Sequence, residues 1–339
     1  MSTRAICALL LALPTAGLLT GCNDEAAELL LTCEGGNVEA CYNDGLGYSD
    51  TTRPQYNNAR KSFSTACMKD IHPKLRTENP ERAKAQAMAR AKSCYSLGKL
   101  VRDAKGGPKD LARAAELFEI ACKPDLANPA AGPQVPDACV DLAYALWDGE
   151  QVRQDPERSV ELLGTACKGE TPDHRACTLL AVAYAEGRGV EKADEDRAKE
   201  LMSTSCDAQY ADACVKAGDF ATEGKRKADT ETAASFYQKG CEIDARKGCY
   251  ELAQLHAEGK FDSASDASAS EFFQKTCNID PTRGCFEAAK LMEEGKVEAR
   301  EGQIESLYNT ACEHGHTEAC SKRQIDLEAV REAQRKNKK

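Results

Sequence analysis

The sequence predicts an all-α fold, an α-solenoid of helix–turn–helix repeats that are stapled together by disulfides. Three observations predict it: cysteines recur in pairs, apolar residues between the pairs follow a helical period, and a glycine ends each apolar stripe. The chain has 339 residues with 18 cysteines, and it is 42% hydrophobic but only 6% aromatic. We therefore expect a core in which alanine lets the helices approach closely.

Charge and hydropathy exclude several classes of protein. Charged residues make up 29% of the chain beside the 42% that are hydrophobic, a balance typical of folded proteins. The formal net charge of −10 argues against a nucleic-acid partner, because phosphates require a basic face. Past residue 21 no run of 18 apolar residues occurs, so we expect no membrane-spanning segment after processing.

The first residues have the pattern of an export signal. Arg4 precedes a short apolar stretch, so residues 1–21 are predicted to be a signal peptide. The segment Leu19-Thr20-Gly21-Cys22 is similar to the lipobox of bacterial lipoproteins, and this resemblance implies that Cys22 becomes the lipidated mature N-terminus. The alternative is an ordinary signal with a chance cysteine.

A lipidated Cys22 would place the protein in the bacterial cell envelope. The acyl chains would anchor it to a membrane, with residues 22–32 as a tether. Asn23 follows Cys22, and under the enterobacterial sorting rule this favours the periplasmic face of the outer membrane over the inner membrane.

The remaining cysteines are predicted to form disulfides. Cys7 leaves with the signal and Cys22 carries lipid, so an even number of cysteines is left. An exported chain reaches an oxidising compartment, where thiols pair. The spacings select neighbouring partners: Cys33–Cys41, Cys67–Cys94, Cys122–Cys139, Cys167–Cys177, Cys206–Cys214, Cys241–Cys249, Cys277–Cys285 and Cys312–Cys320.

Most of these pairs are separated by eight positions, which fixes where they can lie. Within one helix such residues are about 12 Å apart, far beyond the roughly 4.4–6.8 Å between the Cα atoms of a disulfide. Each pair must therefore straddle a turn between helices. The spacings of zinc sites and of C-x-x-C redox sites do not occur in the sequence, so we predict structural disulfides, no metal and no cofactor.

The cysteine pairs mark a repeat of 35 or 36 residues. Four positions before each first cysteine stands a large apolar residue: Phe63, Phe118, Leu163, Met202, Tyr237, Phe273 and Tyr308. Apolar or small residues follow the second cysteine at +3, +4 and +7, and a glycine follows at +10 in Gly149, Gly187, Gly224, Gly259 and Gly295. We predict one helix ending in a left-handed glycine and a second helix ending at the next cysteine. Ala104 stands where an earlier repeat should have this glycine.

The residues Leu180–Val190, followed by Ala198, Leu201 and Cys206, resemble a Sel-1-like repeat, which is a TPR-like unit. With a cysteine pair in each repeat, the chain is similar to the cysteine-rich Hcp proteins, often grouped with β-lactamases. The resemblance covers residues 139–320 well and 33–138 more loosely, because insertions at 68–93 and 123–138 stretch the repeats. It implies a repeat array over 33–320, with a C-terminal capping helix and basic tail over 321–339.

The two insertions differ in character. Residues 68–92 carry a net charge of +4, which is either a solvated surface or a face for an acidic partner or anionic lipid. Asn79-Pro80-Glu81 predicts the start of a long helix over 80–103. Residues 123–136 contain four prolines and are predicted to form a non-helical loop.

The resemblance implies a search for β-lactam chemistry. A serine enzyme of this kind needs S-x-x-K with S-D-N and K-T-G partners, but the sequence holds only Ser96-Leu97-Gly98-Lys99, a match expected by chance. His314 and His316 beside Glu313 are predicted to be an exposed polar turn, and His256 a packing residue. We therefore predict no catalytic residue.

Acidic residues recur before the helix-ending glycines: Asp148, Glu186, Glu223, Glu258 and Glu294. Four are followed across the glycine by a base: Arg188, Lys225, Lys260 and Lys296. Local charge neutralisation is one explanation, and an acidic ladder for a basic partner is the other.

These observations predict an envelope lipoprotein that acts as a disulfide-stabilised interaction scaffold for an unknown protein or peptide partner. The alternative from the Hcp resemblance is a β-lactam-binding or β-lactam-hydrolysing protein, with a cell-wall or β-lactam ligand. A third hypothesis, disulfide exchange, requires a reactive thiol.

Overall fold

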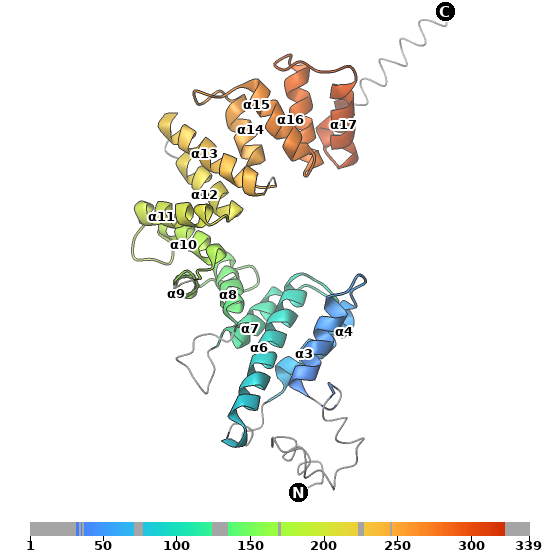
Figure 1. Cartoon of the computed structure of the whole chain (residues 1–339), viewed down its shortest axis with the longest axis vertical. Coiled ribbons are helices and arrows are strands. Elements are labelled where there is room, and N and C mark those ends of the chain that lie inside the picture. Colours follow the sequence, from blue (N-terminus) through green and yellow to red (C-terminus); the bar gives the residue numbers. More distant parts are fainter. Residues whose placement is uncertain are drawn as a thin grey trace, which may run out of the picture. The chain divides into compact units, whose positions relative to one another are not determined.

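The computed structural model describes residues 32–33, 35, 37–70, 77–123, 135–168, 171–222, 227–244 and 246–322. These residues form helices and connecting turns, with no strand among them (Figure 1). The predicted all-α repeat fold is confirmed. The predicted signal peptide, lipidated Cys22 and most of the tether and tail lie outside the described residues, as do His72, Glu223, Gly224 and Lys225.

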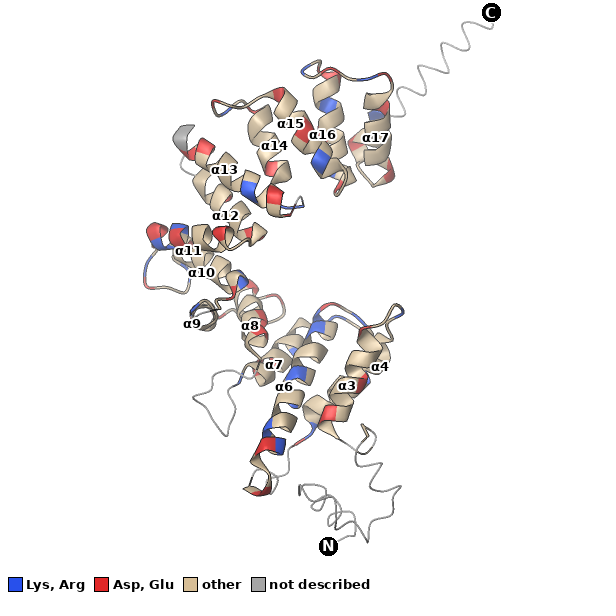
Figure 2. Cartoon of the chain, in the orientation of Figure 1, with Lys and Arg blue, Asp and Glu red and all other residues tan. Residues whose placement is uncertain are grey.

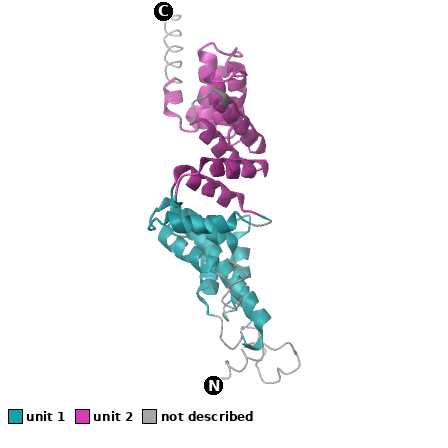
Figure 3. Ribbon diagram, turned by 90° about the vertical axis from the view of Figure 1, so that its left-hand side faces the viewer, with its two compact units in different colours: residues 1–171, 188–191 teal, residues 172–187, 192–339 magenta. Residues whose placement is uncertain are grey.

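The chain divides into two compact units (Figure 3). The first comprises the chain to Thr171 together with Arg188–Glu191, and the second comprises Pro172–Gly187 and the chain from Lys192. The first unit contains α3 (Val38–Ser49), α4 (Tyr56–Met68), α6 (Pro80–Arg102), α7 (Leu111–Cys122), α8 (Pro136–Asp148) and α9 (Pro156–Ala166). The second contains α10 (His174–Glu186), α11 (Glu195–Asp207), α12 (Ala211–Thr222), α13 (Lys227–Ile243), α14 (Cys249–Ala257), α15 (Asp266–Cys277), α16 (Pro281–Glu293) and α17 (Gln303–Glu313).

Within each unit the helices form pairs, and each helix packs against the next one along the chain. The first helices of the pairs are α3, α6 and α8 in the first unit, and α10, α12, α14 and α16 in the second. Apart from α6, which starts at Pro80 and contains Cys94 well inside it, they begin around the second cysteine of a predicted pair. The second helices end around the first cysteine of the next pair. This is the helix–turn–helix repeat expected from the spacing.

Side chains at the helix starts explain the boundaries. The carboxylates of Asp110, Asp155, Asp173, Asp194 and Asp280 each accept a hydrogen bond from a backbone N–H in the first turn. Asn79 does the same for α6, so the helix predicted over 80–103 is confirmed to within one residue.

One end of the predicted proline loop is wrong. Pro136 is the first residue of α8, because the first position of a helix needs no backbone N–H and suits the fixed proline φ. Residues 124–134 of that loop lie outside the described residues.

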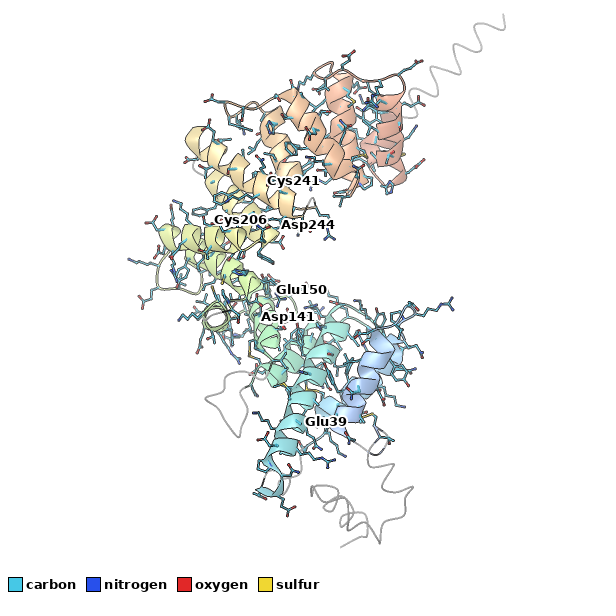
Figure 4. All side chains as sticks on the ribbon, viewed as in Figure 1. Glu39, Asp141, Glu150, Cys206, Cys241 and Asp244 are labelled. Atoms are coloured by element: carbon cyan, nitrogen blue, oxygen red, sulfur yellow. A yellow bond between two sulfur atoms is a disulfide. The ribbon has the colours of Figure 1, made fainter. Side chains whose placement is uncertain are left out.

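The structure brings the predicted cysteine partners together at the corners between repeats. Seven pairs have Cα–Cα distances of 4.3–4.8 Å and form disulfides. Cys206 at the end of α11, for example, is bonded to Cys214 on α12, and Figure 4 labels Cys206 and Cys241 at two such corners. Cys167 and Cys177 are also disulfide-bonded, and the described part of the chain holds no free cysteine.

Aromatic residues of the second helices pack against glycines of the first helices. A Cβ atom on Gly98 of α6 would lie 2.6 Å from the ring of Phe118 on α7, and both Phe118 and its neighbours form a buried cluster. Gly45 meets Phe63 and Gly218 meets Tyr237 in the same way. Glycine at this position therefore makes room for a full ring between paired helices.

Two repeats add a polar link between their helices. The Tyr237 hydroxyl of α13 donates to Asp219 of α12 at 2.9 Å, and the Tyr308 hydroxyl of α17 donates to Glu293 of α16 at 2.8 Å. Burial together with the neighbouring carboxylate raises the pKa of both phenols above the usual value, so both remain donors.

The predicted left-handed glycines are present at four described helix ends. Gly149, Gly187, Gly259 and Gly295 have φ values of 72°, 69°, 63° and 69°. At the corresponding position after α6, Ala104 takes a φ of 55°. The array therefore imposes the same backbone conformation on an L-residue that disfavours it.

Replacing Ala104 with glycine should raise the free energy of unfolding by about 0.5–1 kcal/mol. Glycine removes the strain of the left-handed conformation, although the greater freedom of glycine in the unfolded chain offsets part of this stabilisation. The measurement is urea unfolding followed by circular dichroism. Gly295→Ala is the matched control, since its Cβ would meet nothing within 4 Å, and it should lower stability by about 1 kcal/mol. A destabilising Ala104→Gly would contradict this account.

Candidate functional site

The first unit contains a cavity of about 540 Å³ that we call the α6 groove. Its floor is formed by Lys92, Tyr95, Ser96 and Lys99, which recur at helical spacing on one side of α6. Residues of α3, of α4 and of the start of α8 form the walls: Tyr42, Leu46, Asp50, Tyr56, Val135 and Asp137. Several helices of the first unit thus contribute to one concave surface.

Aromatic rings position two of the lysines in the groove. The Lys99 Nζ atom lies 4.5 Å from the centroid of the Tyr95 ring, and Lys105 Nζ lies 5.7 Å from that of Tyr56. The Tyr95 ring in turn packs against Phe118, with centroids 5.9 Å apart. Cation–π attraction holds an ammonium group at a ring while leaving its hydrogen-bond donors available.

The acidic residue at the end of α6 is already neutralised. Asp103 accepts from Arg102 Nε at 2.8 Å and lies 3.8 Å from Lys105 Nζ. The hydrogen bond from Arg102 holds the pKa of Asp103 below its usual value. Arg102 also contacts the buried Asp141 of α8 at 3.1 Å, a residue labelled in Figure 4. In contrast, no carboxylate oxygen among the described residues lies within 4 Å of Lys92 or Lys99 Nζ.

Arg60, which sequence reasoning missed, fixes one end of the groove. Its Nε–H donates to the carbonyl oxygen of Lys105 at 2.7 Å, and its Nη2 donates to that of Leu100 at 2.8 Å. A side chain of α4 therefore satisfies carbonyls at the end of α6 and orders the turn that follows. No local sequence signal identifies such a contact, because the partners lie about 40 positions apart.

The serine and lysine of the S-x-x-K match both line the α6 groove. Lys99, however, lies at the ring of Tyr95, and the sequence contains neither of the partner motifs that a serine β-lactamase needs. Within the described ranges, no three His, Cys, Asp or Glu residues are placed to hold a metal ion.

Two of the described histidines, His256 and His316, have structural roles. His256 is buried between Phe261 and Phe272, with ring centroids 4.8 and 5.6 Å away, and accepts from the Ser265 backbone N–H at 3.3 Å. Its predicted packing role is confirmed. The predicted exposed turn is wrong for His316. Its ring stacks on that of Phe286, with centroids 4.0 Å apart, and its imidazole accepts a hydrogen bond from the Ala319 N–H at the start of the next helix.

The pH dependence of stability should report on His256. Burial lowers the pKa of His256, so the folded state holds it neutral while the unfolded chain protonates it near pH 6.5. The contribution of neutral His256 to the free energy of unfolding should be fully present above that pH and should fall as the pH drops below it. Urea unfolding at pH 7.5 and 5.5 measures the loss, which should be smaller in His256→Asn than in the wild type. The exposed His314→Asn variant is the control, and an unchanged slope in His256→Asn would contradict the assignment.

The acidic residues at the helix ends are neutralised locally in two repeats. Lys260 contacts Glu258 at 2.8 Å, and Lys296 contacts Glu294 at 2.9 Å. Arg188 behaves differently: its guanidinium lies 4.2 Å from the centroid of the Trp147 ring and donates to the Trp147 carbonyl. These contacts favour neutralisation over an acidic ladder.

A second cavity of about 590 Å³ lies in the second unit. Residues of α10, α11, α12 and α13 line it, including Met202, Phe220 and Phe236. Lys199 Nζ lies 5.6 Å from the Phe220 ring centroid and pairs with Glu195 at 3.8 Å. This cavity has fewer aromatic residues in its lining than the α6 groove, and its lysine already has an acidic partner.

The comparison with known families decides the class of repeat. The description of the Sel1 repeat matches residues 91–123, 136–170, 174–210, 211–244 and 246–278, just over half of the chain. The chain belongs to the Sel1 repeat family. Each matched segment covers one helix pair, from α6 and α7 to α14 and α15, although the first of them starts inside α6. The pairs α3–α4 and α16–α17 extend this Sel1 architecture on either side.

One solved structure agrees on the fold, and two others are more distant. A Sel1 repeat protein from Oxalobacter formigenes is 18% identical with a TM-score of 0.56, over 82% of this chain and 99% of that one. The protective antigen c5321 of uropathogenic Escherichia coli, which has an SLR fold, is 18% identical with a TM-score of 0.42, over 91% and 68% of the two chains. The immunity protein Pa5087 of Pseudomonas aeruginosa is 16% identical with a TM-score of 0.40, over 72% and 82%. No curated protein matches the sequence.

Proposed function

We propose that this Sel1-repeat protein is a lipid-anchored scaffold of the bacterial envelope that binds a protein or peptide partner through the α6 groove. The observation that carries the proposal is a concave surface lined by several helices, with polar, aromatic and cationic side chains. Stacked repeats commonly bind partners on such surfaces. The disulfides at the corners would keep the surface rigid outside the cytoplasm.

The membrane anchor in this proposal rests on the lipobox-like segment that ends at Cys22. In the part of the chain with described coordinates, no helix is long and apolar enough to cross a bilayer. A Cys22→Ala variant should therefore leave the membrane fraction, and metabolic labelling with a fatty acid should disappear. Unchanged membrane association would contradict the lipid anchor but would leave the proposed scaffold function unaffected.

Site-specific photo-crosslinking in intact cells tests the partner. We expect a photoreactive phenylalanine analogue at Tyr95, in the groove, to yield a discrete adduct. The same analogue at the exposed Glu157 of α9 should yield none and is the control. No adduct from Tyr95, nor from Phe220 in the second cavity, would contradict the scaffold function.

The β-lactam alternative is supported by the family resemblance and by the position of Ser96 and Lys99 in one groove. We expect no turnover of nitrocefin by the purified, oxidised protein, because the remaining motifs are absent. Turnover that disappears in Ser96→Ala would reverse the order of the two proposals. For disulfide exchange we expect no alkylation before denaturation, since the described cysteines are all bonded.

A further inference from the structure

We infer that the α6 groove selects an acidic, extended peptide segment with two carboxylates about 10 Å apart. This inference rests on the proposed scaffold function and names the chemistry of its partner. The contacts that carry it are those of Lys92 and Lys99 on the groove floor.

The two lysines combine a place in a cavity with the absence of an acidic partner. Other lysines of the first unit also lack such a partner among the described residues but do not line the groove: Lys61, Lys69, Lys84, Lys123 and Lys168. In the second unit, acidic side chains pair with Lys199, Lys216, Lys239, Lys247, Lys260, Lys275, Lys296 and Lys322. Lys92 and Lys99 have no such pair among the described side chains, and both line a cavity. Lys99 lies in the last turn of α6 and complements the helix dipole, but Lys92 lies in the middle of the helix, so the dipole does not explain both.

The groove lining holds as many aspartates as lysines, but none of these aspartates forms an ion pair with Lys92 or Lys99, although the charge of Lys99 helps to hold the pKa of Asp103 low. Asp103 is held by Arg102 and Lys105. Asp50 lies at the end of α3 and accepts from the Ser49 hydroxyl at 3.2 Å, whereas Asp137 lies in the first turn of α8, where the helix dipole favours a carboxylate. The floor of the groove is therefore cationic between two acidic walls, and Figure 2 shows Lys and Arg along α6.

The spacing of the lysines fits an extended chain. They are seven residues apart on one helix, which places them about 10.5 Å apart along the axis. A polyproline II peptide advances about 3.1 Å per residue with three residues per turn, so carboxylates three residues apart lie on the same face and are separated by a similar distance. Between the lysines, the Ser96 hydroxyl lies on the same floor and can bond to the peptide backbone.

A peptide fits this geometry better than a membrane does. Lys99 is half-buried on the floor of a concave groove whose walls come from α3, α4 and α8, and Lys92 is exposed on the same floor. Lipid headgroups instead form a broad surface that favours lysines that are all exposed. The chain as a whole carries a net charge of −10, so an acidic segment is repelled elsewhere and attracted here. Binding should weaken as salt increases.

The test uses the full-length, oxidised lipoprotein in detergent and fluorescence anisotropy of two labelled peptides. One has the sequence Gly-Ser-Glu-Ser-Ser-Glu-Ser-Gly, and the other has Gln in place of both Glu residues. We expect the acidic peptide to bind at least about tenfold more tightly at low salt. The double variant Lys92→Gln/Lys99→Gln should remove this preference, whereas Lys61→Gln/Lys192→Gln, which changes two exposed lysines, should retain it.

Three results would overturn the inference: equal binding of the two peptides, an acidic preference that survives in Lys92→Gln/Lys99→Gln, or loss of binding in both double variants alike. Vesicles with anionic lipid are the further arm. If they bind the purified protein through Lys92 and Lys99 and displace the peptide, a membrane is the ligand and the inference fails. Crosslinking from Tyr95 does not depend on these lysines, so an adduct without an acidic preference would reject the inference and leave the scaffold function standing.

Discussion

Replacing Cys206 and Cys214 together by alanine is expected to lower the free energy of unfolding by about 2.5 kcal/mol, the chain-entropy value for a closed loop of nine residues. Both cysteines are buried, and their bond joins α11 to α12 across a repeat boundary. In a stacked array each repeat is stabilised mainly by its neighbours, so the loss should appear as weaker coupling between the two sides of this boundary. Urea unfolding under non-reducing conditions measures it.

The Cys67–Cys94 pair provides the comparison. It is equally buried, but its partners are 27 positions apart. The longer loop raises the expected loss for the double alanine variant to about 3.5 kcal/mol. Equal losses for the two pairs would show that strain or packing, not loop closure, determines the effect. Non-reducing peptide mapping should first recover Cys206 linked to Cys214 and Cys67 linked to Cys94. Peptides in which these cysteines are not linked would contradict the disulfides between repeats.

Gly98→Ala should lower the free energy of unfolding by about 1–3 kcal/mol, the usual cost of overfilling a packed core. The added Cβ would lie 2.6 Å from the Phe118 ring, and the ring is buried within the cluster of the first unit. One of the paired helices α6 and α7 must therefore shift. Thermal and urea unfolding measure the loss.

Another repeat of the chain carries the compensating pair of residues. There alanine stands at the position of Gly98, as Ala143, and the second helix carries Leu163 where α7 carries Phe118; both are buried. Phe118→Leu should therefore recover most of the loss in the Gly98→Ala background, although Phe118→Leu alone should be destabilising by leaving a gap. This is a coupling between contacting residues, and additive losses in the double variant would contradict it.

The helical repeat could be predicted because its signals are local. Cysteine spacing, the apolar stripe and the glycine at +10 all repeat within about 36 residues, and each helix start carries a short capping signal. The left-handed turn after α6 could not be predicted, because Ala104 stands where the other repeats have a glycine. The backbone there follows the stacking of the repeats, whereas a sequence pattern reports only which residue tolerates the turn best.

The groove could be predicted only in part. The basic segment around α6 was visible in the sequence, but not that Lys92 and Lys99 share a cavity with Tyr42 and Tyr56. Contacts such as Arg60 with the Leu100 carbonyl, or Arg188 with Trp147, join residues about 40 positions apart. One repeat length separates these partners, so they meet only after neighbouring repeats have stacked.

The placement of each disulfide across a repeat boundary bears on how such a chain can grow or shrink. A deletion of residues 215–249 would remove Cys241 and Cys249 together and leave Cys214 still bonded to Cys206, because the cut falls between equivalent points of adjacent repeats. Unequal recombination that adds or removes one repeat would therefore leave no cysteine without its disulfide partner. The number of repeats could change over evolutionary time without ever exposing a mismatched thiol to oxidation.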